Sequence, residues 1–186
     1  MNKRYPLGHV GDLAISAEPS AAGGAVLLLA VFSFLGRRVF RLTPRAALAG
    51  GLLATMLHFL SELWHQSGHA RAAERTGYPM TGVNLWGVLG TSIYPDEPDL
   101  PGELHVERAL GGPKASAWLV AAGVLAGLVT RPLNRFAFVV STLFALENLL
   151  VFTVGALLPM PFVETDGMTL RKHRQAHRKR MVVVQE

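Results

Sequence analysis

The sequence predicts an α-helical membrane protein with about four transmembrane helices and a short β-hairpin or strand segment between the second and third spans. Three observations predict this class. Half of the 186 residues are hydrophobic and only 17% are charged, which is too apolar for an ordinary soluble domain. Four apolar runs approach the length that a bilayer core demands, with Lys and Arg gathered outside them. Between the second and third runs, an apolar piece punctuated by glycines favours strands over helix.

The predicted spans cover residues 21–35, 46–70, 115–130 and 136–158. An Arg lies just after each of the first three, and Pro159 ends the fourth. The first run is the shortest, and it makes a poor signal peptide because two Arg follow where a cleavage site is expected. Two acids lie inside the runs, Glu62 in the second and Glu147 in the fourth. An ionisable group inside an apolar span indicates a partner or a function.

The loop between the second and third spans has two parts. Residues 80–94 are apolar and contain three glycines, which predicts short strands near the end of the second span. The second part is acidic, with Asp96, Glu97, Asp99, Glu103 and Glu107. The basic tail that begins at Arg171 is typical of a solvated cytoplasmic anchor, and we expect no nucleic-acid partner from it.

The distribution of positive charge predicts the topology. Four crossings leave the N-terminus, the central loop and the tail on one side, with twelve of the 18 Lys and Arg residues. The two short connections on the other side carry the remaining six. The positive-inside rule therefore predicts a cytoplasmic location for the C-terminal ends of the second and fourth spans, although four Arg in the first connection argue the other way.

Two histidines four residues apart carry the clearest functional signal. His65 and His69 lie on one face of the second span, a spacing typical of the His-Glu-x-x-His zinc motif, in which the Glu accepts a proton from the attacking water. In this chain Gln66 stands in place of that Glu. Because the chain has no Cys, nitrogen and oxygen must supply all the ligands of any zinc.

A catalytic zinc needs a third protein ligand, and Asp166 is the candidate. It follows the proline break that ends the fourth span, and Gly167 beside it permits a tight turn or a close backbone approach. Two crossings separate Asp166 from the His pair, so the chain returns it to the same membrane face.

At this point the chain resembles the site-2 protease family of intramembrane zinc metalloproteases, with Gln in place of the catalytic Glu. Three stretches in the family's order carry the resemblance: His65 with Gly68-His69, Gly112-Pro113-x-x-Ser116, and Asn148 followed by Leu-Leu-Pro and Asp166-Gly167. The resemblance implies a three-helix core over residues 46–170, preceded by residues 1–45 with an added span and followed by the tail, 171–186. It also implies zinc held by His65, His69 and Asp166, substrate contacts by Ser116 and Asn148, and a transmembrane substrate that unwinds beside residues 80–94.

The chain departs from the family pattern at several positions. Gln66 replaces the general base, Ser116 and Ala156 stand where Asn is usual, and two extra residues precede Asp166. A neutral amide hydrogen-bonds a water but takes up no proton at ordinary pH. Glu62, one helical turn before Gln66, is the candidate substitute base or extra ligand. Ser116 equally suits a bond within its own helix. Asn148 has the same alternative, although its place before Leu-Leu-Pro favours the functional role.

Two functions follow as hypotheses. The first is a membrane-embedded zinc metalloprotease that acts on transmembrane segments and is impaired by Gln66. The second is a pseudoprotease that binds membrane helices in the bilayer without cleaving them; an engineered Glu-to-Gln change would give the same sequence. A di-iron desaturase is disfavoured because it needs several His-rich boxes, and a transporter because no paired repeat of broken helices occurs.

Overall fold

Four long helices and one small sheet make up the fold in the computed structural model, which describes residues 3–95, 100–160 and 165–173. Helices α1 (Pro19–Arg38), α2 (Pro44–Arg75) and α3 (Gly102–Thr130) precede α4 (Arg135–Glu147), which continues as the π-helix η1 (Asn148–Gly155). The strands are β1 (Tyr5–Val10), β2 (Leu13–Ala17), β3 (Gly82–Trp86) and β4 (Leu89–Ile93). The acidic residues Asp96, Glu97 and Asp99 and most of the basic tail, 174–186, lie outside the described residues.

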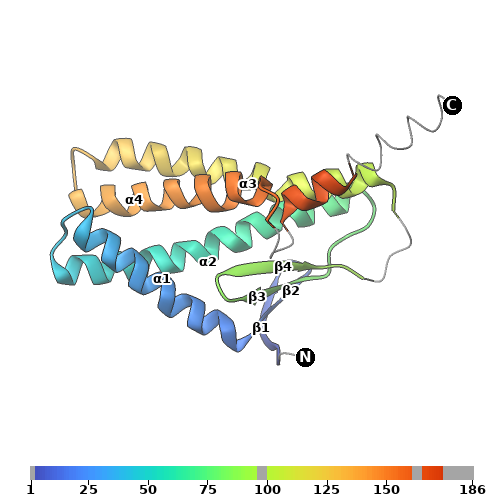
Figure 1. The fold of residues 1–186 in the computed structure, drawn as a ribbon, viewed down its shortest axis with the longest axis horizontal. Coiled ribbons are helices and arrows are strands. Elements are labelled where there is room, and N and C mark those ends of the chain that lie inside the picture. Colours follow the sequence, from blue (N-terminus) through green and yellow to red (C-terminus); the bar gives the residue numbers. More distant parts are fainter. Residues whose placement is uncertain (1–2, 96–99, 161–164, 174–186) are drawn as a thin grey trace.

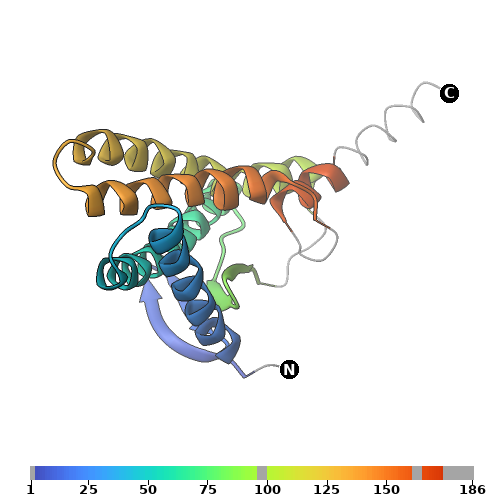
Figure 2. The same cartoon turned by 60° about the vertical axis from the view of Figure 1, so that its left-hand side comes forward.

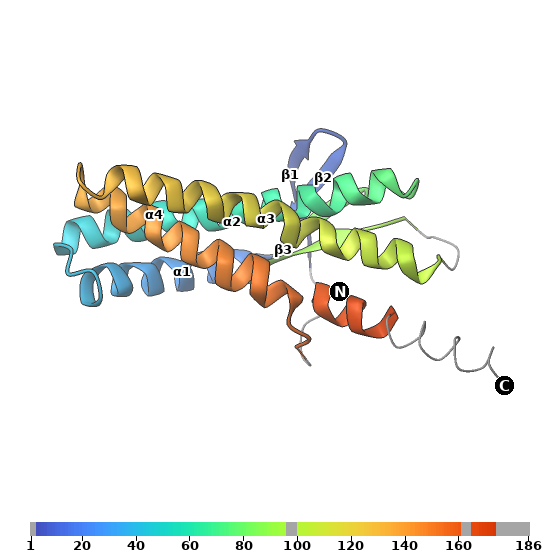
Figure 3. The same ribbon diagram turned by 90° about the horizontal axis from the view of Figure 1, so that it is seen from above.

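The helices form the membrane part of the molecule. Helices α2, α3 and α4 lie side by side along the long axis, and α1 crosses α2 obliquely (Figures 1 and 3). Each of α1, α2 and α3, and α4 together with η1, is long and apolar enough to cross a bilayer. Large apolar side chains such as Leu27, Trp118 and Leu128 point outward and are exposed. The prediction of an integral membrane protein is therefore confirmed, and four helices have the length and composition of membrane spans.

Local sequence signals fix the helix ends. Thr43 accepts a hydrogen bond from the Ala46 backbone N–H and caps α2, and Pro44 occupies its first turn. Asn134 caps α4 in the same way. Helix α3 begins at Gly102, well before the predicted apolar run 115–130. The first three turns of α3 are too polar for lipid, so apolar length alone underestimated this helix.

The four strands form one sheet in the order β1-β2-β3-β4. Strands β1 and β2 pair antiparallel, β2 pairs parallel with β3, and β3 pairs antiparallel with β4. Sequence patterns indicated no strands before α1. The N-terminal residues thus join the same sheet as the segment that follows α2, below one end of that helix in Figure 1.

One face of the sheet packs on α2. Side chains of Ile15, Val83 and Leu85 point toward the helix and are buried with Met80 and Ala73. A second apolar cluster, which includes Phe32, Ala54, Val139 and Leu143, joins α1, α2 and α4 farther along the bundle. Figure 2 shows the sheet on one side of α2 and the α3–α4 pair on the other. The polar face of α2 therefore lies in the protein interior between these layers.

Candidate metal site

Helix α2 carries an interior polar face. Its members recur every three or four residues, which places them on one side of the helix, and all are buried: His58, Ser61, Glu62, His65, Gln66 and His69. Unpaired polar groups in an apolar interior are costly, so each of these side chains requires a partner.

The two histidines and the aspartate predicted from the sequence come together. The Nε2 atoms of His65 and His69 lie 3.0 Å apart. One carboxylate oxygen of Asp166 lies 3.4 Å from His65 Nε2, and the other lies 3.4 Å from His69 Nε2. Two nitrogen ligands of a tetrahedral zinc ion lie roughly 3.3 Å apart, given Zn–N bonds of about 2.0–2.1 Å. The three side chains thus have the spacing of a metal ligand set.

Close backbone approaches build this group. At the crossing of α2 and α3, a Cβ on either Gly68 or Gly111 would overlap the carbonyl oxygen of the other. A Cβ on Gly112 would fill the space beside both Nε2 atoms. Gly167 approaches the Leu157 carbonyl closely enough to exclude a side chain, and this contact holds the start of the helical segment that carries Asp166.

The outer ring nitrogens fix how both imidazoles are presented. His69 Nδ1 lies 2.8 Å from the Arg108 carbonyl oxygen, which can only accept, so Nδ1 carries the proton. His65 Nδ1 lies 3.0 Å from Ser116 Oγ. With a proton on Nδ1, loss of the other ring proton would leave Nε2, which lies at the group's centre, free to ligate a metal ion. The residues present therefore fit a metal ion.

Asp166 supplies the negative charge of the group. Burial by itself would raise the pKa of its carboxyl, but hydrogen bonds and charge from His65 and His69 outweigh that effect. The pKa of Asp166 consequently lies below its usual value, and the side chain is a carboxylate at neutral pH. An ionised carboxylate is the form that ligates a metal.

Gln66 lies on the same helical face with all its polar positions in use. Its amide Nε2 donates to Glu62 Oε1 at 2.8 Å and to the Gly90 carbonyl at 3.1 Å. Its Oε1 accepts from Ser92 Oγ at 2.7 Å. Gln66 thus bonds α2 to β4. The Glu62 carboxyl and the Gly90 carbonyl are the two acceptors for its amide N–H groups.

The other predicted residues face inward. Ser116 and Asn148 are fully buried: Ser116 bonds His65, and Asn148 donates to Ser61 Oγ and the Phe144 carbonyl. Both bonds of Asn148 use its amide nitrogen, whereas its Oδ1 is buried without a hydrogen-bond partner among the described residues. Sequence reasoning missed Ser92 and the Arg108 carbonyl. A serine in a strand and a backbone carbonyl give no distinctive signal, and only the fold brings them to Gln66 and His69.

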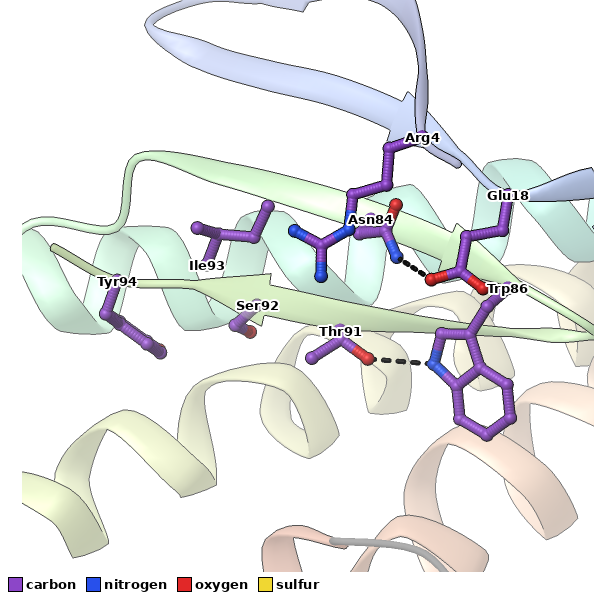
Figure 4. A pocket seen from close by; sticks show the side chains of 8 residues that line it. All are labelled: Arg4, Glu18, Asn84, Trp86, Thr91, Ser92, Ile93 and Tyr94. Atoms are coloured by element: carbon purple, nitrogen blue, oxygen red, sulfur yellow. Dashed lines mark hydrogen bonds between the residues drawn. The ribbon is translucent and has the colours of Figure 1, made fainter. Parts of the chain in front are cut away.

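An open cavity of about 520 Å³ lies along β4 beside this cluster (Figure 4). Bonds between Trp86 Nε1 and Thr91 Oγ1 and between Asn84 Nδ2 and Glu18 Oε1 tie its walls. Ser92 lines the cavity and also bonds Gln66 on α2. Its lining residues are Arg4, Glu18, Asn84, Trp86, Thr91, Ser92, Ile93 and Tyr94.

Comparison with known proteins finds a match in structure. No family model matches the chain, and no curated protein matches it by sequence. A solved structure, the Site-2 Protease from Methanocaldococcus jannaschii, is similar with a TM-score of 0.62 and 16% sequence identity. The alignment covers 94% of this chain and 73% of that one. At this identity the likeness shows that the two chains share a fold.

Proposed function

We propose that this chain is a membrane-embedded zinc metalloprotease of the site-2 protease type whose hydrolytic step is impaired by Gln66. The convergence of His65, His69 and Asp166 carries this proposal. It is supported by the likeness to a site-2 protease fold and by the position of the three residues in a four-span membrane protein. Neutral imidazole nitrogen and carboxylate oxygen are ligands that suit zinc.

The chain's own residues prepare the site. His65, His69 and Asp166 would hold the metal, while Ser116 Oγ and the Arg108 carbonyl orient the two rings. Gly112 keeps the space beside the Nε2 atoms free of a side chain. Bound zinc would supply Lewis acidity to polarise a peptide carbonyl and activate water.

Proton transfer is the weak point of the reaction. Gln66 stands at the position of the family's general base and takes up no proton, and loss of a general base costs a factor of about 100 to 10,000. In this proposal Glu62, which is buried and bonded to Gln66, is the substitute general base. If that role is correct, Glu62→Gln abolishes residual cleavage; unchanged cleavage contradicts it.

A second function is favoured by the surroundings of Gln66. Its amide donates to a carboxylate and to a strand carbonyl, and an ionised Glu would offer neither donor. An interior fitted to an amide supports a pseudoprotease that binds membrane helices without cleaving them. In either case the proposed partners are transmembrane segments of other proteins in the lipid bilayer, with the metal group on the cytoplasmic side and no nucleic acid involved.

The test measures bound zinc and cleavage of a helical membrane substrate in detergent or proteoliposomes. The proteins are the unaltered chain, Gln66→Glu and His65→Ala. Cleavage by the unaltered chain that disappears in His65→Ala supports the protease. Zinc without cleavage, with activity only in Gln66→Glu, supports the pseudoprotease. Absence of zinc from the unaltered chain in zinc-containing buffer contradicts the zinc metalloprotease.

A further inference from the structure

A second buried polar group lies on α2, two helical turns before the metal group. His58 is 2% exposed, and both its ring nitrogens are in short contacts. Its Nε2 lies 2.6 Å from the Val88 carbonyl oxygen, and its Nδ1 lies 2.6 Å from Glu147 Oε1. His58 thereby connects the turn between β3 and β4 to the last residue of α4.

The positions of the protons define how the Val88 carbonyl, His58 and Glu147 are linked. The Val88 carbonyl has no proton to donate, so Nε2 of His58 must carry one. The contact between Nδ1 and Glu147 then contains a single shared proton, whichever partner holds it. Either arrangement aligns the ring with both partners. A histidine and a glutamate inside a membrane bundle are expensive to bury, so this link calls for a role.

The turn held by His58 is also fixed from its other side. It consists of Gly87, which has a positive φ of 52°, and Val88. Ser20 Oγ on α1 accepts from the Gly87 backbone N–H at 3.2 Å. A Cβ on Gly24 would overlap the Gly87 carbonyl, so α1 touches the turn directly. The hairpin tip is therefore enclosed between α1 and α2, and His58 supplies the α2 contact.

Side chains of α2 bond alternate residues of the turn and of β4. His58 binds the Val88 carbonyl, and Gln66, two turns farther along α2, binds the Gly90 carbonyl. Successive carbonyls of a strand point in opposite directions, so those of Val88 and Gly90 lie on one side. Ser92 continues the series through its bond to Gln66. His58 thus sets where β4 begins its course beside the metal group.

Glu147 extends the link toward Asp166. It precedes the π-helix η1, which leads to Leu157, and the Leu157 carbonyl contacts Gly167 next to Asp166. Within η1, the Phe152 ring packs on both His58 and His65, with ring centroids 5.2 and 5.9 Å away. The same pair therefore connects the two segments that flank the metal group, β4 and the approach to Asp166.

We propose that His58 is a positioning residue that, through its paired bonds to Val88 and Glu147, fixes β4 relative to the metal group. The inference rests on the proposed function and on the expectation, implied by the family resemblance, that a transmembrane substrate unwinds beside residues 80–94, which include β4. The role is one of geometry: the hydrogen bond between His58 and residue 147 is required, and the charge of Glu147 is not.

Two variants at one position separate geometry from charge. Glu147→Gln keeps a hydrogen-bonding group, since its amide can donate to Nδ1 while Nε2 remains on Val88. Glu147→Met has a similar length and lacks that bond. His58→Phe keeps the ring packing and removes both bonds. Hydrogen exchange of residues 88–93, zinc content, and kcat and KM for a helical membrane substrate are measured for each. If the unaltered chain does not cleave, the kinetics use the Gln66→Glu background.

In Glu147→Met and His58→Phe we expect exchange in residues 88–93 to accelerate about tenfold or more. We expect kcat/KM to fall by about 100-fold, with zinc content unchanged, because a displaced substrate path costs rate without removing ligands. Glu147→Gln should remain within about threefold of its parent. If His58→Phe fails to fold, the comparison of Met with Gln at position 147 decides.

The proposal is overturned if Glu147→Met exchanges and cleaves like its parent, or if Glu147→Gln is as impaired as Glu147→Met. The second result would assign the pair a charge or proton-transfer role. If neither the chain nor Gln66→Glu cleaves any substrate, proteolysis fails as the function, and exchange in β4 still decides the role of His58.

Discussion

At Gln66 the chemistry of one side chain is set by three neighbours. A lone Gln in a zinc motif suggests a lost base, but the bonds to Glu62, Gly90 and Ser92 give this amide a structural task as well. The acid has not vanished from the region, because Glu62 lies one turn away within hydrogen-bonding distance of the amide.

Exchanging the two residues should therefore restore more activity than Gln66→Glu alone. The single change sets two carboxyls side by side and opposite a carbonyl, so the pair must share a proton. The combination Glu62→Gln with Gln66→Glu keeps one acid and one amide. We expect it to cleave a membrane substrate faster than Gln66→Glu by about tenfold or more. Equal rates would show that Glu62 does not affect position 66.

Gly112 is the residue whose side chain would most directly disturb the metal group. We expect Gly112→Ala to lose bound zinc, because the added methyl group overlaps both Nε2 atoms. Gly127→Ala, on the same helix, is the control, since its Cβ meets only Ser141 Cβ at 3.9 Å. Metal analysis of the purified proteins measures the effect, and full zinc occupancy in Gly112→Ala would contradict the assigned ligand geometry.

At the scale of elements, the crossing of α2 and α3 determines whether the site can form. Gly68 and Gly111 bring the two backbones together, and small residues are the usual means of close helix approach in membranes. Helix α3 also supplies the Arg108 carbonyl and Ser116, which orient the histidines of α2.

A methyl group at this crossing should loosen the pair. We expect Gly111→Ala to destabilise the protein by about 1–3 kcal/mol, because the opposing backbone of α2 cannot give way without separating the helices. Gly23→Ala on α1, where a Cβ meets nothing within 4 Å, should be neutral or slightly stabilising. Thermal unfolding in detergent compares the two, and equal melting temperatures would contradict the close crossing.

Helices were predicted correctly from the sequence where the helical residues are apolar and face lipid. The apolar runs indicated all four spans, yet α3 begins at Gly102 because its first turns are polar. Strands β1 and β2 were not predicted because they join the sheet through the pairing of β2 with β3, which is remote in sequence. The π-helical turns of η1 also gave no local signal. For the site, spacing and order predicted the His65, His69 and Asp166 group, whereas backbone acceptors such as Val88 depend on the tertiary fold.

At the scale of the whole molecule, one sheet joins residues on both sides of the α1–α2 pair. Strands β1 and β2 precede α1, and β3 and β4 follow α2. Since the sheet is continuous, the N-terminus and the central loop lie on one side of the membrane, as expected when α1 and α2 each cross it. Figure 1 shows β1 and β2 beside β3 and β4, next to the first turns of α1.

Topology is directly testable because the chain has no Cys. We expect a single Cys at Thr91 to react with a membrane-impermeant maleimide only after the cell is opened, since positive charge predicts a cytoplasmic sheet. A Cys at Arg38, the last residue of α1, should react in intact cells. The reverse pattern would contradict the cytoplasmic placement and leave the fold unaffected.

Metal binding should stabilise the entire helix bundle, because the three ligands come from two segments distant in the chain. With free zinc at 100 times its dissociation constant, the expected gain is about 2.7 kcal/mol. Chelation should then lower the melting temperature by several degrees, and zinc should restore it. His65→Ala should show neither response, and a response equal to that of the unaltered chain would exclude His65 as a ligand.

The parallel pairing of β2 with β3 also constrains biosynthesis. When the ribosome has produced residues 1–17, the strand that must join them has not been made, and two membrane crossings come between. The β1–β2 ribbon therefore lacks its third strand until β3, which follows α2, has been made. Completion of the sheet therefore requires α1 and α2 to form an antiparallel hairpin that returns β3 to the side of β2.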